Sequence, residues 1–128
     1  MKCELVDFDT YLKNLKELQK KFNHVINDIE NICQELVLNP TQLATPIPAY
    51  HRKLWKIRIP STDMKRGKRG GFRTIFYYDE DAPCKVYRLT VYVKVERENL
   101  KPQELQQLYK RFMKYLKSSS QKTTQKTT

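Results

Sequence analysis

The side chains of this protein that are best suited to chemistry are lysines and arginines in strand-like sequence. From Arg52 to Arg73 the sequence contains nine basic residues and one acid, Asp63. Closely spaced cations repel one another, so we expect a polyanion such as nucleic acid to bind there. Arginine binds phosphate through paired hydrogen bonds. A lysine surrounded by other cations has a lowered pKa, which suits it to proton transfer near neutral pH.

Cleavage of RNA is a reaction that such residues can carry out. RNA supplies its own nucleophile, the 2′-hydroxyl next to the scissile phosphate. The protein must deprotonate that hydroxyl, neutralise the charge on the phosphoryl group and protonate the 5′-oxygen. Lys56, flanked by Arg58 and expected to face Lys94, is a candidate base. Each of these residues can also be interpreted as a phosphate-binding or solvated residue, so the residue pattern leaves its role open.

The glycines of this region do not form a nucleotide-binding motif. The segment 67–71 (GKRGG) lacks the spacing and the final Lys-Ser/Thr of a P-loop, and it precedes a predicted strand rather than a helix. The sequence also contains neither G-x-S-x-G nor H-E-x-x-H. We expect Gly70 and Gly71 to adopt positive φ and to let the chain re-enter the sheet. A flexible, solvated loop is the alternative interpretation.

The elements that must position these charges follow from hydrophobic periodicity. Alternation and short apolar runs predict strands at Cys3–Phe8, Arg52–Ile59, Phe72–Tyr78 and Lys85–Lys94. Apolar residues at helical spacing predict a helix after a cap at Asp9 or Thr10, a second helix that runs to about Leu38, and a third over Pro102–Leu116.

The order β-α-α-β-β-β-α predicts an α+β fold. We expect a single domain over residues 1–117 and a disordered Ser/Thr/Lys tail over residues 118–128. The short connections predict an antiparallel sheet with a helical hairpin on one face. The other face is expected to stay partly open, with Arg73 beside the basic loop, and to present Lys56, Arg58, Arg88, Tyr92 and Lys94.

Composition indicates a basic globular protein. The chain has 128 residues and a net charge of +11. Residues 1–50 carry five lysines and seven acids, so the positive charge lies in the remainder of the chain. No apolar run approaches the roughly 20 residues that span a bilayer. The N-terminal residues also lack the apolar region of a signal peptide. We therefore expect a cytoplasmic protein with no membrane contact.

Cysteine and histidine are too scattered to predict a metal site. Cys3, Cys33 and Cys84 form no C-x-x-C pair, and both histidines lie far from any cysteine in the sequence. We expect three reduced thiols, no disulfide, no metal and no other cofactor.

Two long motifs resemble the RelE/ParE superfamily of bacterial toxins, in particular its HigB-like members. They are LWKIRIPSTDMKRGKRGGFRTIFYY (Leu54–Tyr78) and YRLTVYVKVERENL (Tyr87–Leu100). With the strand and helical hairpin before them, the resemblance covers nearly all of residues 3–116. It implies a RelE-like fold and a metal-independent endoribonuclease, or mRNA interferase, the toxin of a type II toxin–antitoxin system. Such toxins enter the ribosomal A site, cleave the mRNA codon there to a 2′,3′-cyclic phosphate, and so inhibit translation.

The resemblance also implies roles for individual residues. It assigns catalysis to Lys56, Arg58, Arg73 and Lys94, with Lys56 or Lys94 as base and Arg73 as the clamp on the transition state. RNA binding is assigned to Lys65, Arg66, Lys68, Arg69, Tyr92 and Arg97. Tyr92 would stack on a base, and a packing role within its strand is the alternative. Val95 stands where RelE has a further arginine, so the division between acid and base stays open.

The sequence also leads to expectations about the partners of the protein and about two alternative functions. The resemblance implies the ribosome and mRNA as targets, and an antitoxin of the helix-turn-helix, HigA-like type that covers the basic surface with an acidic or apolar segment. One alternative is a ParE-like gyrase poison, which needs no catalytic residues. A second is a noncatalytic RNA-binding or ribosome-binding module, whose affinity would fall steeply with salt.

Overall fold

A computed structural model describes residues 2–64 and 70–127, with the backbone alone for residues 120–127. The chain forms two compact units, Met1–Glu98 and Asn99–Thr128, which are described separately.

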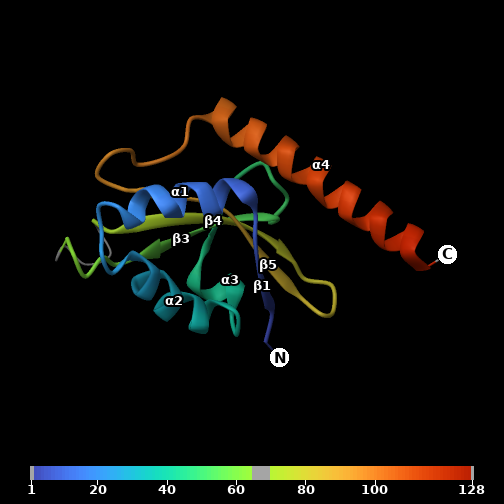
Figure 1. Ribbon diagram of the computed structural model, residues 1–128, viewed down its shortest axis with the longest axis horizontal. Coiled ribbons are helices and arrows are strands. Elements are labelled where there is room, and N and C mark those ends of the chain that lie inside the picture. Colours follow the sequence, from blue (N-terminus) through green and yellow to red (C-terminus); the bar gives the residue numbers. More distant parts are fainter. Residues whose placement is uncertain (1, 65–69, 128) are drawn as a thin grey trace. The chain divides into compact units, whose positions relative to one another are not determined.

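The first unit is built on a five-stranded sheet in the order β1-β5-β4-β3-β2. Figure 1 shows this sheet with the helices that follow β1 in the chain. The strands are β1 (Glu4–Asp7), β2 (Thr45–Pro46), β3 (Leu54–Ile59), β4 (Phe72–Asp79) and β5 (Lys85–Val93). The helices are α1 (Asp9–Gln19), α2 (Val25–Leu36) and the short α3 (Pro40–Leu43). The four predicted strands and the two predicted N-terminal helices are therefore confirmed, within an α+β fold.

The prediction of a purely antiparallel sheet is wrong, because β1 runs parallel to β5. The antiparallel part comprises β2, β3, β4 and β5. On the other side of β5, Glu4 is aligned with Lys85 and Asp7 with Arg88 in a parallel register. A parallel pair needs a long connection, and the whole chain from α1 to β4 supplies it here. The element order also gains α3 and β2, both from the proline-rich segment between α2 and β3.

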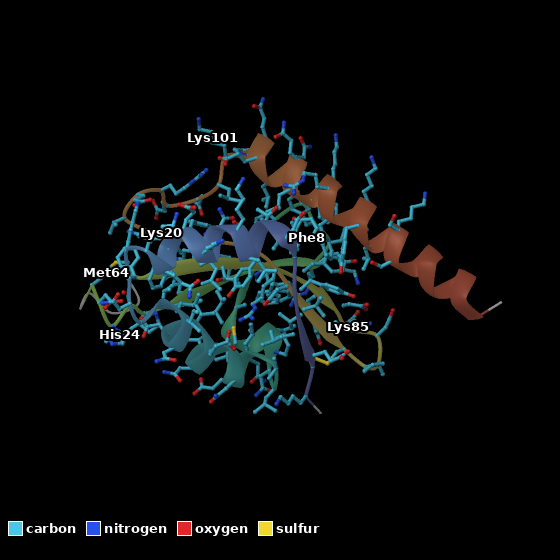
Figure 2. The ribbon with its side chains drawn as sticks, in the orientation of Figure 1. Phe8, Lys20, His24, Met64, Lys85 and Lys101 are labelled. Atoms are coloured by element: carbon cyan, nitrogen blue, oxygen red, sulfur yellow. A yellow bond between two sulfur atoms is a disulfide. The ribbon has the colours of Figure 1, made fainter. Side chains whose placement is uncertain are left out.

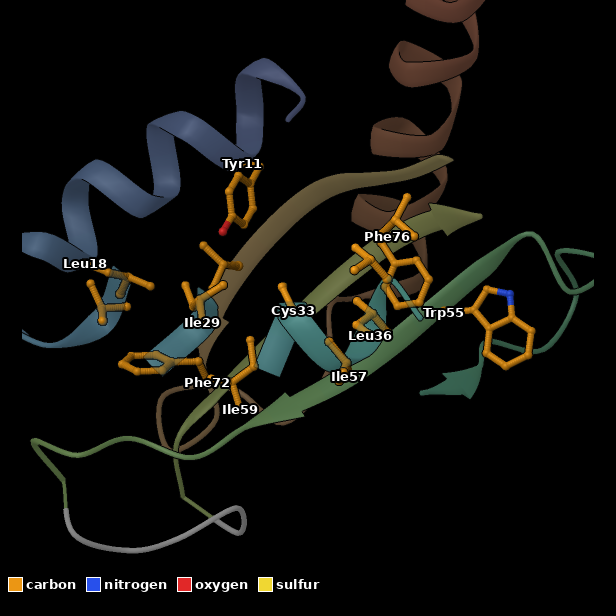
Figure 3. Packing of buried hydrophobic residues seen from close by; sticks show 14 of the residues in the cluster. Tyr11, Leu18, Ile29, Cys33, Leu36, Trp55, Ile57, Ile59, Phe72 and Phe76 are labelled. Atoms are coloured by element: carbon orange, nitrogen blue, oxygen red, sulfur yellow. The ribbon is translucent and has the colours of Figure 1, made fainter. Parts of the chain in front are cut away.

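The helical hairpin covers one face of the sheet, which we call the first face. Tyr11 and Leu18 of α1 and Ile29 of α2 belong to the same buried cluster as Ile57 of β3 and Phe72 of β4. Figure 3 shows these side chains between the helices and the strands. The spacing of the apolar residues in α1 and α2 thus serves packing, as the sequence pattern predicts. The alternate residues of β3 are left on the opposite side, which we call the second face.

A β-bulge in β5 overturns the predicted place of Arg88. Ile75 pairs with Thr90 and Phe76 pairs with Arg88, so Leu89 is an extra residue on β5. Consecutive residues of β4 lie on opposite faces of the sheet. The bulge therefore places Arg88, paired with Phe76, and Tyr92, paired with Arg73, on opposite faces, although simple alternation would put them on the same one.

Arg88 lies on the first face and joins the sheet to the hairpin. Its guanidinium donates to both carboxylate oxygens of Asp7, at 2.6 and 3.0 Å, and to Glu30 at 2.8 Å. The same group lies over the ring of Tyr11, 4.7 Å from its centre. Arg88 is buried, so its charge stabilises the core and is not part of a basic surface.

The expectation of three reduced thiols is also wrong. Cys3 and Cys84 form a disulfide, whereas Cys33 is a free, buried thiol. The parallel pairing of β1 with β5 aligns the residues at which the two strands begin, and the Glu4 N–H donates to the Cys84 carbonyl. This long-range pairing brings together two cysteines that are 81 residues apart.

The second unit consists of a loop and helix α4 (Pro102–Thr127). Glu104 accepts a hydrogen bond from the backbone N–H of Lys101 at 3.3 Å, which stabilises the start of the helix. The helix runs past the predicted end at Leu116, and the backbone of the Ser/Thr/Lys segment is helical to Thr127. Across the residues that the structure describes, no helix has the length and apolar character needed to cross a membrane.

Candidate functional site

Three of the residues predicted for RNA chemistry form one row across the second face. Arg58 of β3 pairs with Arg73 of β4, and Arg73 pairs with Tyr92 of β5. Lys56 lies two residues before Arg58 on β3 and therefore on the same face. We call Lys56, Arg58 and Arg73 the cationic cluster.

The members of the cationic cluster differ in accessibility. Arg58 is exposed and Lys56 is half-buried, whereas only 4% of Arg73 is exposed. The Arg73 guanidinium donates through Nη1 to the carbonyl oxygens of Phe72 at 3.0 Å and Gly70 at 3.3 Å. Arg58 and Lys56 therefore present the accessible charge, and Arg73 adds positive potential from a buried, fixed position.

The pKa of the lysine in the cluster is lowered by its surroundings. Burial lowers the pKa of Lys56, and the positive charges of Arg73 and Arg58 lower it further. Burial and the charge of Arg58 likewise lower the pKa of Arg73. The direction agrees with the prediction of a lowered lysine pKa, although burial contributes more to it than the neighbouring cations on which the prediction rested.

Lys94 lies elsewhere than expected. The register aligns Lys56 with Ile75 and Thr90, and Lys94 is four positions farther along the chain from Thr90. Four strand positions correspond to roughly 13 Å, so the prediction that Lys56 faces Lys94 is wrong. Lys94 is half-buried beside Gly71, whose carbonyl accepts the Lys94 backbone N–H at 3.1 Å.

Tyr92 is enclosed by the segment that follows β5. Only 8% of the residue is exposed, and its hydroxyl donates to the Glu98 carbonyl at 3.4 Å. The Arg97 guanidinium lies 6.0 Å from the centre of the Tyr92 ring. Of the two interpretations of Tyr92, this burial favours the packing role over base stacking. Arg97, predicted to bind RNA, is brought close to the cationic cluster by the same turn of the chain.

Glu98 is a residue that sequence analysis missed. Its negative charge raises the pKa values of both Lys56 and Arg73, against the larger effects that lower them. Glu98 is itself exposed. The sequence contains a signal for this residue, because the acids Glu96 and Glu98 directly follow a strand that carries several cations.

The basic loop between β3 and β4 is anchored where it begins. Asp63 accepts the His24 backbone N–H at 2.9 Å, and the His24 Nδ1 lies 2.8 Å from the second Asp63 oxygen. Asp28 of α2 accepts both the backbone N–H and the hydroxyl of Thr62, at 2.9 and 2.6 Å. Figure 2 shows His24 and Met64 at the same end of the molecule. The predicted RNA-binding residues Lys65, Arg66, Lys68 and Arg69 lie outside the described residues.

At the other end of the loop, Gly71 has the positive φ expected of it, +41°. A Cβ atom at this position would overlap the carbonyl oxygen of Ile59. Glycine is therefore required for the chain to enter β4 close to β3, two residues before Arg73.

The chemistry open to this site is phosphate binding and proton exchange. Two accessible cations, the Arg58 guanidinium and the Lys56 amine, can bind a phosphoryl group, and the buried Arg73 guanidinium adds positive potential. The charge of one carboxylate, Glu98, acts on the same cluster. Within residues 2–64 and 70–127, no group of three or more His, Cys, Asp or Glu side chains is arranged to hold a metal ion. Comparison of the chain with protein-family models and with curated proteins gives no match.

Proposed function

We propose that this protein is the toxin of a type II toxin–antitoxin system and acts as a ribosome-dependent endoribonuclease of the RelE type. In this proposal it works in the cytoplasm, cleaves mRNA codons in the ribosomal A site by 2′-hydroxyl attack, and inhibits translation. A helix-turn-helix antitoxin of the HigA-like kind neutralises it. The observation that carries the proposal is the pairing of Arg58 with Arg73 beside a lysine whose pKa both arginines lower.

The cationic cluster suits the charge changes of RNA cleavage. Arg58 is accessible and can bind the scissile phosphate through paired hydrogen bonds. Arg73 is held by two backbone carbonyls, so its charge requires little rearrangement as negative charge develops on the phosphoryl oxygens. Lys56 exchanges a proton with the reacting RNA, because its lowered pKa lies closer to neutrality than that of an ordinary lysine.

The proposal is tested by mapping mRNA 5′ ends after induction of the protein in growing bacteria. Wild type should produce new 5′ ends within translated frames, and Arg73→Ala should not. Lys85→Ala is the matched control, because it removes one positive charge at the start of β5, away from the cationic cluster. The same cuts should appear with purified ribosomes and a programmed mRNA, and should disappear when ribosomes are omitted.

Other outcomes point to the alternatives. Growth arrest without cuts in translated frames would favour a gyrase poison. Salt-sensitive binding to ribosomes or RNA without cleavage would favour a noncatalytic module, since phosphate binding requires only the charges of the cluster. Cuts that persist in Arg73→Ala would remove Arg73 from the proposed site.

A further inference from the structure

We propose that Glu98 is the base that accepts the proton of the RNA 2′-hydroxyl, and that the Lys56 ammonium is the acid that protonates the leaving 5′-oxygen. This inference rests on the proposed ribonuclease function and assigns the two proton transfers within it. It differs from the expectation that a lysine, Lys56 or Lys94, serves as the base.

Geometry brings the Glu98 backbone to the row of residues across the second face. Tyr92 stands in register with Arg73, which stands in register with Arg58. The Tyr92 hydroxyl donates to the Glu98 carbonyl at 3.4 Å, so the chain beyond β5 turns back toward this row. The Arg97 guanidinium over the Tyr92 ring provides a second contact of the same turn.

Charge interactions also link Glu98 to the cationic cluster. Its charge acts on both Lys56 and Arg73, which belong to two different strands. The turn that brings the Glu98 backbone to Tyr92 puts this residue on the same side of the sheet as the cluster. Because Glu98 is exposed, RNA bound at the accessible Arg58 can reach its carboxylate.

The protonation states at neutral pH decide which group has which role. A carboxylate is ionised at pH 7 and a lysine amine carries its proton. In these populated forms, Glu98 is ready to accept a proton and Lys56 is ready to donate one. Burial and the two arginines make the Lys56 ammonium a stronger acid than usual, which favours proton donation to the leaving group. With Lys56 as the base, the small neutral fraction of the amine would have to react.

The proposed step balances in atoms and charge. The 2′-hydroxyl proton moves to the Glu98 carboxylate as the 2′-oxygen forms a bond to phosphorus. The bond from phosphorus to the 5′-oxygen breaks, and that oxygen takes a proton from the Lys56 ammonium. The products are a 2′,3′-cyclic phosphate and a 5′-hydroxyl. Solvent then restores both side chains to their starting forms.

The test measures single-turnover cleavage of a ribosome-bound mRNA at neutral pH. Glu98→Gln should slow cleavage by about 100-fold or more, the usual contribution of one proton-transfer group. Glu96→Gln is the matched control. It makes the same change two residues away, where Glu96 pairs with Lys21, and it should keep the wild-type rate.

A modified substrate separates the acid from the base. An mRNA with sulfur in place of the 5′-bridging oxygen has a leaving group that needs no proton. It should restore cleavage by Lys56→Gln but not by Glu98→Gln. A purely structural defect would not show this selectivity, and thermal melting of both variants checks that they fold.

The two proposals fail in distinguishable ways. No cleavage by wild type on ribosomes would overturn the ribonuclease function itself. Normal cleavage by wild type, together with an unchanged rate in Glu98→Gln, would overturn the role of Glu98 alone. Rescue of Glu98→Gln by the sulfur substrate, with no rescue of Lys56→Gln, would reverse the assignment and so contradict it.

Discussion

Arg58 and Arg73 occupy directly paired positions on β3 and β4, so two like charges face each other across neighbouring strands. Like charges at paired positions destabilise a sheet. Arg73 is also almost completely buried, which makes its charge costly to keep. An arrangement that opposes folding is typical of a binding or catalytic site, where function favours residues that stability does not.

Replacing Arg58 should therefore stabilise the fold while weakening function. We expect Arg58→Gln to raise the free energy of unfolding by roughly 0.2–1 kcal/mol, because it removes the repulsion with Arg73. The measurement is urea unfolding, alongside the mRNA cleavage assay. Arg52→Gln is the control. It should lower the free energy of unfolding, since the Arg52 guanidinium makes a favourable contact over the Trp55 ring, 4.9 Å from its centre. A loss of stability in Arg58→Gln would contradict the repulsive pairing.

The pKa of Lys56 should respond to its neighbours in opposite directions. Arg58 lowers this pKa, so Arg58→Gln should raise it. Glu98 raises it, so Glu98→Gln should lower it further. Titration of the Lys56 side-chain carbon signals by NMR measures both shifts. Glu96→Gln should leave the pKa in place, and shifts of the same sign in the two test variants would count against the proposed site.

The buried ion pairs of Arg88 should dominate the electrostatic part of stability. Arg88→Ala leaves the carboxylates of Asp7 and Glu30, which are 28% and 44% exposed, without their buried partner. The loss of these charge-assisted hydrogen bonds should cost about 1.5–3 kcal/mol. Lys20→Ala removes an exposed pair with Glu17 and should cost less than about 1 kcal/mol. Urea unfolding of the two variants gives both values. Similar losses in the two would show that Arg88 does not join the sheet to the hairpin.

The Cys3–Cys84 disulfide closes most of the first unit into one loop, and reducing it should destabilise the fold. We expect a loss of about 2–4 kcal/mol on treatment with dithiothreitol, because the unfolded chain regains conformational freedom. Cys84→Ser should show no further loss with the same reagent. Since disulfides are uncommon in the cytoplasm, thiol alkylation in the induced cells would establish which form acts there. Equal stability of the oxidised and reduced protein would refute the prediction.

The His24–Asp63 contact should make loop anchoring depend on pH. The hydrogen bond and charge of Asp63 raise the pKa of His24 above its ordinary 6.5. The His24 part of the stabilisation is therefore complete below pH 6.5 and is lost as pH rises through the raised pKa. The hydrogen bonds from His24 lower the pKa of Asp63 below its ordinary 3.8. The Asp63 part is present above pH 3.8 and is lost as pH falls through the lowered pKa.

The measurable quantity is the stability difference between wild type and His24→Gln. It should be largest between pH 3.8 and 6.5 and should shrink toward pH 8. His51→Gln replaces the other histidine and should leave the pH dependence of wild type unchanged. A difference that stays constant from pH 5 to pH 8 would show that His24 does not titrate with Asp63.

Local sequence patterns determined the elements and part of the site. Tyr11 and Leu18 at helical spacing predicted a helix with a buried stripe, because such residues fall on one side of a helix. Alternation placed Lys56 and Arg58 on one face of β3 and Ile57 on the other, because side chains of a strand alternate. The concentration of cations between Arg52 and Arg73 predicted a lowered pKa at Lys56. Each of these predictions depends only on residues that lie close together in the sequence.

Only the tertiary structure decided what depends on pairing between distant segments. Parallel pairing of β1 with β5 brought Cys3 to Cys84, and no local pattern specifies which strand a short edge strand will join. The bulge at Leu89 moved Arg88 to the core, because one extra residue reverses the faces of all residues beyond it. The turn after β5 brought Glu98 to the cationic cluster through a hydroxyl–carbonyl contact that periodicity does not encode.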